Sequence, residues 1–508
     1  MDVPLGNRGD SGVDNVVDWE GEGDRTHPFN WPKRKKALII GCLFLMSIVS
    51  PFTSSVIAPA LPNIMIDYKT SNQYLSSFVL SVYVLGYAAG PLLISPLSEL
   101  YGRVPLYHIC NVVFTICTWR CAYSTSLRDL AILRFFAGVG SSSVFALVPS
   151  SIADMVVKEK RGAAFAVIAI AYNLGPALSP TAGSYINAAW GWKWIFHVTA
   201  IMGGAVTLLA IPLLWETYEP VLLRRKAQKQ SKSTGNPHLR SRLDVEVGSN
   251  KLKILSRAMV MPLRMLLAPS IVLICFITAV GYGWLYILYS TLPVTFLTTY
   301  GWAPKKIGLA YLGAAVGNLI GMVAGGGISD AIVKRKAAKS DHRPENRLLP
   351  MIFMWPLVGV GLIIYGWTAH YAVHWIGPMI GTAIFGAGAM SAIFFTGTYI
   401  VDAYPLHSAS GMAASSVLRS LIGGLAPLFA TKLYQKLNVG WAFSLLAFIS
   451  LAFAPIPWVC YRYGEKWRRK ERVGERTDVE DRETGAAEPA GAELDSLPRT
   501  NEVGRAEV

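Results

Sequence analysis

The chain has 508 residues, of which 52% are hydrophobic and only 16% are charged. Soluble proteins carry about 25% charged residues, and here the apolar residues occur in blocks of roughly twenty, the length that crosses a bilayer. This composition excludes a soluble enzyme, a nucleic-acid-binding protein and a disordered scaffold. The formal net charge of +15 then reflects membrane topology, because lysine and arginine collect on the cytoplasmic side.

Twelve apolar blocks predict an all-α membrane protein with two halves of six transmembrane helices. The predicted spans cover residues 37–58, 75–95, 105–122, 129–151, 163–186, 195–215, 269–297, 307–328, 349–367, 376–400, 409–431 and 439–461. They divide the chain into an N-terminal tail (1–36), a first half (37–215), a central loop (216–268), a second half (269–461) and a C-terminal tail (462–508). The last forty residues are rich in Glu, Arg, Gly and Ala, so we expect the C-terminal tail to be disordered.

The basic residues predict the orientation of these spans. With the N-terminus inside, the inner segments hold 37 lysines and arginines and the outer segments hold eight. A lost span would invert every later loop, so this asymmetry supports the count of twelve. Both termini are therefore predicted to be cytoplasmic. The basic central loop needs no nucleic-acid partner, because a linker that faces anionic lipid explains its charge.

The two halves resemble each other at several points. Gly90, Ser98, Glu99 and Arg103 near the end of span 2 match Gly321, Ser329, Asp330 and Lys334 near the end of span 8, with the same spacings from glycine to acid and from acid to base. Asp154 after span 4 matches Asp402 after span 10. Gly175, Pro176 and Pro180 in span 5 match Gly424 and Pro427 in span 11. This pattern favours a duplication into two pseudo-symmetric halves, a transporter architecture with its substrate site between them.

The segment SPLSELYGRVP (95–105) is the strongest local signal. Glu99 and Arg103 lie four residues apart, so they face one another on a helical turn, and Gly102 permits a tight turn. We interpret them as an inner gate, a charge latch that closes the cytoplasmic side. A tight turn with topology-setting charge is the alternative, and the echo in Asp330 and Lys334 favours the latch. Asp154 and Asp402 would complete this gate, against the alternative of ordinary interfacial charge.

Two arginines lie inside predicted spans. Arg419 is about ten residues into span 11, roughly 15 Å deep, where an unpaired arginine costs several kcal/mol. It is a candidate for substrate binding or for a response to a proton. Arg134 is only about five residues inside span 4, so snorkelling to the outer interface is an equal alternative there.

No Asp or Glu lies in the middle of any span. A proton-driven carrier usually needs a titratable group in its path, and here the candidates are peripheral. They are Asp67, Glu99, Asp154, Asp330 and Asp402, with His108 and His197 near span ends. The coupling residue stays open, and the spans offer no fixed anionic site for a cationic substrate.

Polar and aromatic residues near span centres are candidates to line a cavity, with lipid contact or packing as the alternative for each aromatic. They are Asn173, Tyr282, Trp284, Tyr286, Asn318 and Tyr399. Such side chains suit a large amphipathic ligand. Glycines and prolines of spans 5 and 11 permit bends and close helix packing. These hinge candidates are Gly175, Pro176, Pro180, Gly183, Gly424 and Pro427.

The chain resembles fungal major facilitator superfamily transporters of the twelve-span drug:proton antiporter type, over about residues 17–470. Matching segments include PFTSSVIAPALPNI, GPLLISPLSELYGR, LRFFAGVGSS, WGWKWIF, WETYEPVLLRRKA and YIVDAYPLHSASGMAASSVLRSLIGGLAPLF. The resemblance implies proton-antiport efflux. It assigns Glu99, Gly102 and Arg103 to the inner-turn motif, Arg134 and Gly138 to the span 4 motif, and Gly175, Pro176, Pro180 and Gly183 to the antiporter motif.

Two departures from the family pattern stand out. Val104 replaces a second basic residue of the inner turn, which bears on the strength of the latch. Ser179 and Ala182 replace glycines of span 5, which bears on the strictness of antiport coupling.

We predict a monomeric plasma-membrane exporter of a drug, toxin or secondary metabolite that works by alternating access and is driven by protons. Its partners are the substrate, protons and the lipid bilayer. It needs no nucleic acid, cofactor or metal. A facilitative carrier or polyamine exporter is the alternative, although the missing mid-span carboxylates count against polyamines. A transporter-like sensor that signals through its tails fits less well, and no nucleophile, metal cluster or phosphate loop supports an enzyme.

Overall fold

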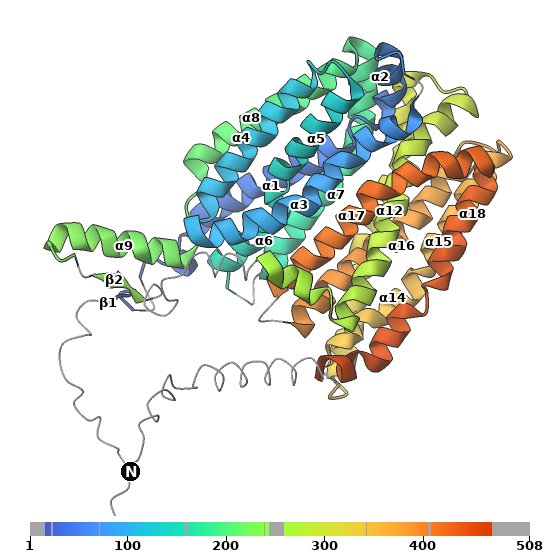
Figure 1. The fold of residues 1–508 in the computed structure, drawn as a ribbon. Helices are drawn as coiled ribbons and strands as arrows, with labels where there is room; N and C mark the ends of the chain where they lie inside the picture. The colour runs from blue at the N-terminus through green and yellow to red at the C-terminus, as the bar shows by residue number, and fades with distance from the viewer. Residues whose placement is uncertain are drawn as a thin grey trace, which may run out of the picture.

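The computed structural model describes residues 16–21, 24–70, 72–157, 161–237, 239–242, 259–341, 343–404 and 408–469. Two helical bundles lie side by side (Figure 1). The first contains α1 (Lys33–Ser55), η3 (Ala58–Ala60), α2 (Leu61–Asp67), α3 (Gln73–Tyr101), α4 (Arg103–Cys121), α5 (Leu127–Ser141), α6 (Ser143–Met155), α7 (Arg161–Trp190) and α8 (Trp192–Leu213).

The second bundle repeats this plan. It contains α12 (Pro269–Thr298), η5 (Pro304–Tyr311), α13 (Leu312–Ala337), η6 (Pro344–Leu348), α14 (Leu349–Met354), α15 (Pro356–His370), α16 (Ile376–Ala403), α17 (Ser408–Lys436) and α18 (Val439–Ala452). The last membrane-length stretch continues to Arg469, so residues 462–469, which were assigned to the disordered tail, are helical. Residues 470–508 of that predicted tail lie outside the described residues.

Eleven stretches of the described chain are long and apolar enough to cross a membrane. They correspond to the predicted spans with one exception, the third. That span (105–122) coincides with α4, a helix of 19 residues whose hydropathy is lowered by Arg103, His108, Asn111 and Arg120. Helix α4 packs against α5 and α8 inside the first bundle, where Arg103 and Asn111 are buried, while Arg120 is exposed.

The helix ends follow local chemistry. Gly102 and Gly191 separate consecutive helices with φ angles of 97° and 88°, a backbone region that suits glycine. Side chains of Asn72, Ser126 and Asn438 accept hydrogen bonds from the first turns of α3, α5 and α18, which satisfies exposed helix N–H groups.

The end of the bundle that carries α9 (Glu219–Thr234) is called the loop face, and the opposite end, where α2 lies, the far face (Figure 1). At the loop face, the predicted N-terminal tail and central loop meet in two short parallel strands, β1 (Val16–Val17) and β2 (Arg240–Ser241). Three ionic contacts reinforce them, because Lys226 pairs with Glu20 and Asp24, and Arg242 pairs with Asp18. The tail is therefore docked on the central loop.

The two bundles contact each other through few helices. Helix α3 packs on α17, and α7 packs on η5 and α13. These helix pairs form the main contacts between the halves.

Candidate functional site

Arg103 is the centre of a buried polar cluster at the loop face. Its Nε donates to Oδ2 of Asp154 over 3.3 Å, and its Nη1 donates to the Ser98 hydroxyl over 2.5 Å. The guanidinium also lies over the Tyr218 ring at 4.6 Å. Burial is the main cause that raises the pKa of this phenol, so Tyr218 stays neutral beside the arginine. The cluster ties the ends of α3, α4 and α6 together.

Glu216 closes the same corner from the end of α8. Its carboxylate accepts hydrogen bonds from the backbone N–H groups of Arg103 and Val104, at 3.0 and 3.2 Å. A carboxylate at a helix N-terminus is favoured by the helix dipole. The turn also depends on Gly102, because a Cβ there would lie 2.4 Å from Oε2 of Glu216. The sequence interpretation missed Glu216, although the WETYEP segment carries it.

The structure does not contain the expected Glu99–Arg103 latch. Glu99 is exposed, and within the described residues no hydrogen bond or ion pair joins it to Arg103. Arg103 instead turns toward Asp154, because Ser98 and Asp154 lie on the buried side of the turn while Glu99 lies on the solvent side.

The second half carries an equivalent cluster around Arg347. Its Nη1 lies 2.6 Å from Oδ1 of Asp330, its Nε lies 2.9 Å from Oδ2 of Asp402, and Nη1 also donates to the Ser329 hydroxyl over 3.3 Å. The predicted partner Lys334 is exposed, and no ion pair joins it to Asp330 in the described part of the chain. The basic residue of this gate is therefore Arg347.

The two clusters share one design. Each has a serine, an arginine and an aspartate, and the sets are Ser98, Arg103 and Asp154 against Ser329, Arg347 and Asp402. The predicted duplication thus extends to the contacts. The turn in the second half is longer, which moves the arginine to the last turn of η6.

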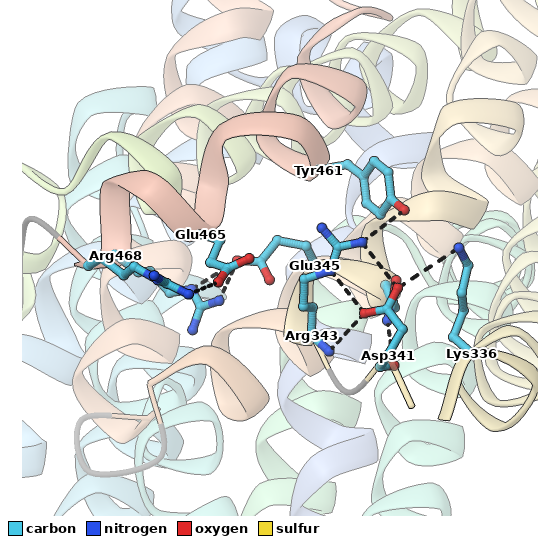
Figure 2. A network of polar contacts seen from close by, with 9 residues as sticks. Lys336, Asp341, Arg343, Glu345, Tyr461, Glu465 and Arg468 are labelled. Atoms are coloured by element: carbon cyan, nitrogen blue, oxygen red, sulfur yellow. Dashed lines mark hydrogen bonds and ion pairs between the residues drawn. The ribbon is translucent and has the colours of Figure 1, made fainter. Parts of the chain in front are cut away.

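A further network joins the helical segment after α18, residues 456–469, to the loop-face turn of the second half (Figure 2). Arg468 donates from Nη2 and Nε to Oε1 of the buried Glu345, at 2.6 and 2.9 Å. Beside it, Arg343 donates from Nε to Asp341 over 2.9 Å, and this contact holds the pKa of the Asp341 carboxyl well below its usual range. Tyr399 lies beside this network near the end of α16, not at a span centre, and its hydroxyl is close to Gly464.

Contacts between the halves lie from mid-depth to the far face. Thr181 of α7 donates to the carbonyl of Gly308 over 3.0 Å, and Ser184 donates to that of Lys305 over 3.2 Å. A Cβ on Gly308 would lie 2.4 Å from Cα of Thr181, so the approach requires glycine. The Tyr286 hydroxyl donates to that of Ser54 over 3.2 Å. The halves are therefore joined at the far face.

Arg134 does not snorkel. It is 1% exposed and donates from Nε to the Val79 carbonyl over 2.7 Å and from Nη2 to the Ser54 carbonyl over 3.0 Å. It therefore holds α1 and α3 against α5. Gly138, of the same motif, lies where a Cβ would be 2.1 Å from the Tyr83 carbonyl, so this crossing also needs a glycine.

The candidates at span centres occupy different places. Tyr282 lies under Arg419, with the ring centroid 5.3 Å from Cζ, and Asn173 donates to Sδ of Met322 across the interface over 2.8 Å. Trp284 faces away from the interface and donates to Ser450 of α18. Asn318 is buried against Gly386 of α16. Tyr282, Tyr286 and Asn173 thus lie at the interface, whereas Trp284 and Asn318 pack within the second half.

The predicted hinge residues are sites of close packing. A Cβ on Gly175 would lie 2.7 Å from the Ile48 carbonyl, and one on Gly183 would lie 2.0 Å from that of Val56. Pro176 and Pro180 lie inside α7, and Pro427 lies inside α17. A Cβ on Gly424 would lie 2.3 Å from the Leu85 side chain of α3. Ser179, where the family has glycine, is buried and lies 2.7 Å from the Ser55 hydroxyl.

Comparison with known proteins decides the family. A sequence model of the Major Facilitator Superfamily matches residues 43–397. The chain belongs to this superfamily. The transporter is 43% identical over 460 residues to the MFS-type transporter atr4 of Stereocaulon alpinum, covering 90% of this chain and 83% of that one. It is 42% identical to the MFS-type transporter penM of Penicillium rubens, covering 89% of each.

Two further comparisons agree. The transporter is 40% identical to the efflux pump radE of Floropilus chiversii, covering 90% of this chain and 86% of that one. A solved structure of the xylose transporter XylE from E. coli, in a partially occluded inward open conformation, has the same fold, with a TM-score of 0.62 at 16% identity. That match covers 84% of this chain and 98% of the other. The transporter family is thus established, and this membrane protein is not an enzyme.

Proposed function

We propose that this transporter exports small hydrophobic or amphipathic compounds, such as a drug, a toxin or a secondary metabolite, in antiport with protons. The observation that carries the proposal is the pair of equivalent Ser–Arg–Asp clusters at the loop face. Each latches one half internally, while the contacts between the halves lie toward the far face. Two rigid halves with contacts at one end suit alternating access by rocking.

The direction of transport and the membrane belong to the same proposal. The basic residues favour a cytoplasmic loop face, so the substrate enters from the cytoplasm and leaves at the far face of the plasma membrane. The relatives described as efflux pumps and MFS-type transporters support export. The carboxylates of Asp154 and Asp402 are the proton-binding candidates, because each pairs with an arginine at the loop face and a proton on the carboxylate would weaken that pair.

The test is efflux from vesicles that contain the purified transporter, with an imposed pH gradient and a panel of apolar, cationic and peptide-like fluorescent compounds. Proton antiport predicts that efflux of at least one compound falls to the rate of protein-free vesicles when an ionophore collapses the gradient. Efflux that is unchanged by collapse would show a facilitative carrier instead.

A further inference from the structure

Arg419 is a cation in the membrane interior without a counter-ion. It is the twelfth residue of α17, about 16 Å from the helix start, and its ring contact is with Tyr282, 5.3 Å from Cζ. Its Nε is buried and has no hydrogen-bond partner. Within the described residues, no ion pair joins Arg419 to a carboxylate. A guanidinium in this position is costly unless it is paired or hydrated.

The side chain lies at the interface between the two halves, because the Tyr282 ring beside it packs on Tyr286, whose hydroxyl donates to Ser54 of the first half. Helix α17 packs on α12 of its own half and on α3 of the other, whereas α7 packs on α1 and η5 at the opposite edge of the interface. The phenol of Tyr172 on α7 nevertheless lies within range of the Arg419 charge, as does the thiol of Cys275 on α12. Arg419 therefore lies near a side chain of the first half as well as one of its own half, and it is partly exposed.

Arg134 shows what a structural arginine looks like in this fold. It is fully buried and uses Nε and Nη2 on backbone carbonyls of α3 and α1, which leaves Nη1 alone unpaired. In the part of the chain that the structure describes, no backbone carbonyl accepts from Arg419, and its Nε is unpartnered. Arg134 therefore holds helices of the first half together, and Arg419 presents its N–H donors to the centre of the transporter.

The surroundings of Arg419 are apolar and aromatic rather than acidic. The acids of the described spans lie at span ends, in the loop-face clusters or at the far face, as with Asp67, which accepts from Trp192. The charged side chain at this site is thus a basic one, with no acidic partner among the described residues. A guanidinium matches a carboxylate with two parallel hydrogen bonds.

We propose that the exported substrate is an amphipathic anion and that Arg419 pairs with its carboxylate or equivalent acidic oxygens, while its apolar body lies against Tyr282 and Tyr172. This inference rests on the proposed export function and names its substrate class. An anion that leaves a negative cell interior is also driven by the membrane potential, so export of this class does not need a carboxylate at mid-span.

The test compares one fluorescent acid with its neutral analogue. Binding of 11-(dansylamino)undecanoic acid and of its primary amide is measured by fluorescence on the purified full-length transporter in nanodiscs at pH 7. We expect the transporter to bind the acid at least tenfold more tightly than the amide. Arg419→Gln should bind both with the affinity of the amide, and Arg419→Lys should keep part of the preference because it keeps the charge.

The matched control is Lys334→Gln, which removes an exposed charge far from Arg419 and should leave the preference intact. Amide binding by Arg419→Gln, with normal elution in gel filtration, shows that this variant is folded. A transporter that does not prefer the acid, or a preference that survives Arg419→Gln, overturns the proposal. Binding is measured without a gradient, so failure of proton antiport in the vesicle assay would leave this result standing.

Discussion

Arg347 donates from Nε to Oδ2 of Asp402 over 2.9 Å, and its Nη1 lies 2.6 Å from Oδ1 of Asp330. One guanidinium thus joins the end of α13 to the end of α16. Without it, two carboxylates face each other at the loop face with no cation between them.

We therefore expect Arg347→Ala to weaken the second half. Partly exposed ion pairs contribute about 1 kcal/mol or less each, so the thermal unfolding midpoint should fall modestly. A change of about 1 kcal/mol in the free-energy difference between the inward-facing and outward-facing states changes the ratio of their populations about fivefold. The transport rate should therefore fall severalfold. Lys334→Ala, the control from the same turn, should change neither quantity. Equal effects of the two variants would contradict the role of Arg347.

The repeat predicted the aspartates of both clusters but not the second arginine. In the first half Ser98 and Arg103 are only five positions apart, so a local spacing rule finds the base. In the second half Ser329 and Arg347 are eighteen residues apart. Lys334 has the spacing from Ser329 that the first half suggests, but its side chain does not reach the aspartates. Contacts across a long turn depend on how the chain folds back, and residue spacing carries no information about that.

Arg419 shows the opposite case. Its depth in an apolar span identified it from sequence alone, because a charge in the membrane interior is rare and costly. Sequence reasoning found the twelve-helix fold for the same reason, since span length is dictated by bilayer thickness. It did not separate Tyr282 from Trp284, two residues on one helix whose opposite directions are decided by the neighbours α17 and α18.

Glu216→Gln tests the cap on α4. The substitution keeps the shape but removes the negative charge that accepts from the N–H groups of Arg103 and Val104. We expect a loss of about 1–2 kcal/mol in stability, measured as a lower thermal unfolding midpoint in detergent. Glu465→Gln removes a partly exposed carboxylate that pairs with Arg469 on its own helix, and it should shift the midpoint far less. A Glu216→Gln midpoint equal to that of the control would argue against the cap.

Gly308→Ala tests the contact between the halves at the far face. The new methyl group would meet Cα of Thr181 at 2.4 Å, so η5 cannot approach α7 and the far face should spend more time open. The reporter is Ser184→Cys in a background without the six native cysteines, labelled by a membrane-impermeant maleimide. Gly308→Ala should raise the labelling rate severalfold. Gly327→Ala, in a helix position with open space around it, should leave the rate unchanged, and a similar increase there would refute the gating role.

The docked N-terminal tail should respond to pH in a defined window. Hydrogen bonds from Thr26, and to a lesser extent from Lys226, hold the pKa of the Asp24 carboxyl well below its ordinary value of 3.8. Burial opposes the charge of Lys226, but its hydrogen bonds to Glu20 and Asp24 raise the pKa of this ammonium above 10.5. Because the pKa of Asp24 is lowered in the docked tail, its charge stabilises docking above pH 3.8. This stabilisation is lost as the pH falls through the pKa that Asp24 has in the docked tail. Because the pKa of Lys226 is raised in the docked tail, its charge stabilises docking below pH 10.5. This stabilisation is lost as the pH rises through the pKa that Lys226 has in the docked tail.

The tail should therefore stay docked between about pH 5 and pH 9. Spin labels on Val16→Cys and Ser233→Cys, which are both exposed, report the distance between β1 and the end of α9 by electron paramagnetic resonance. We expect one narrow distance distribution across this range and a broad one in Lys226→Ala, because Glu20 and Asp24 then lose their shared cation. Lys229→Ala removes an exposed lysine of the same helix and should keep the narrow distribution. Broadening already at pH 5, or in both lysine variants alike, would mean that this ion pair does not hold the tail.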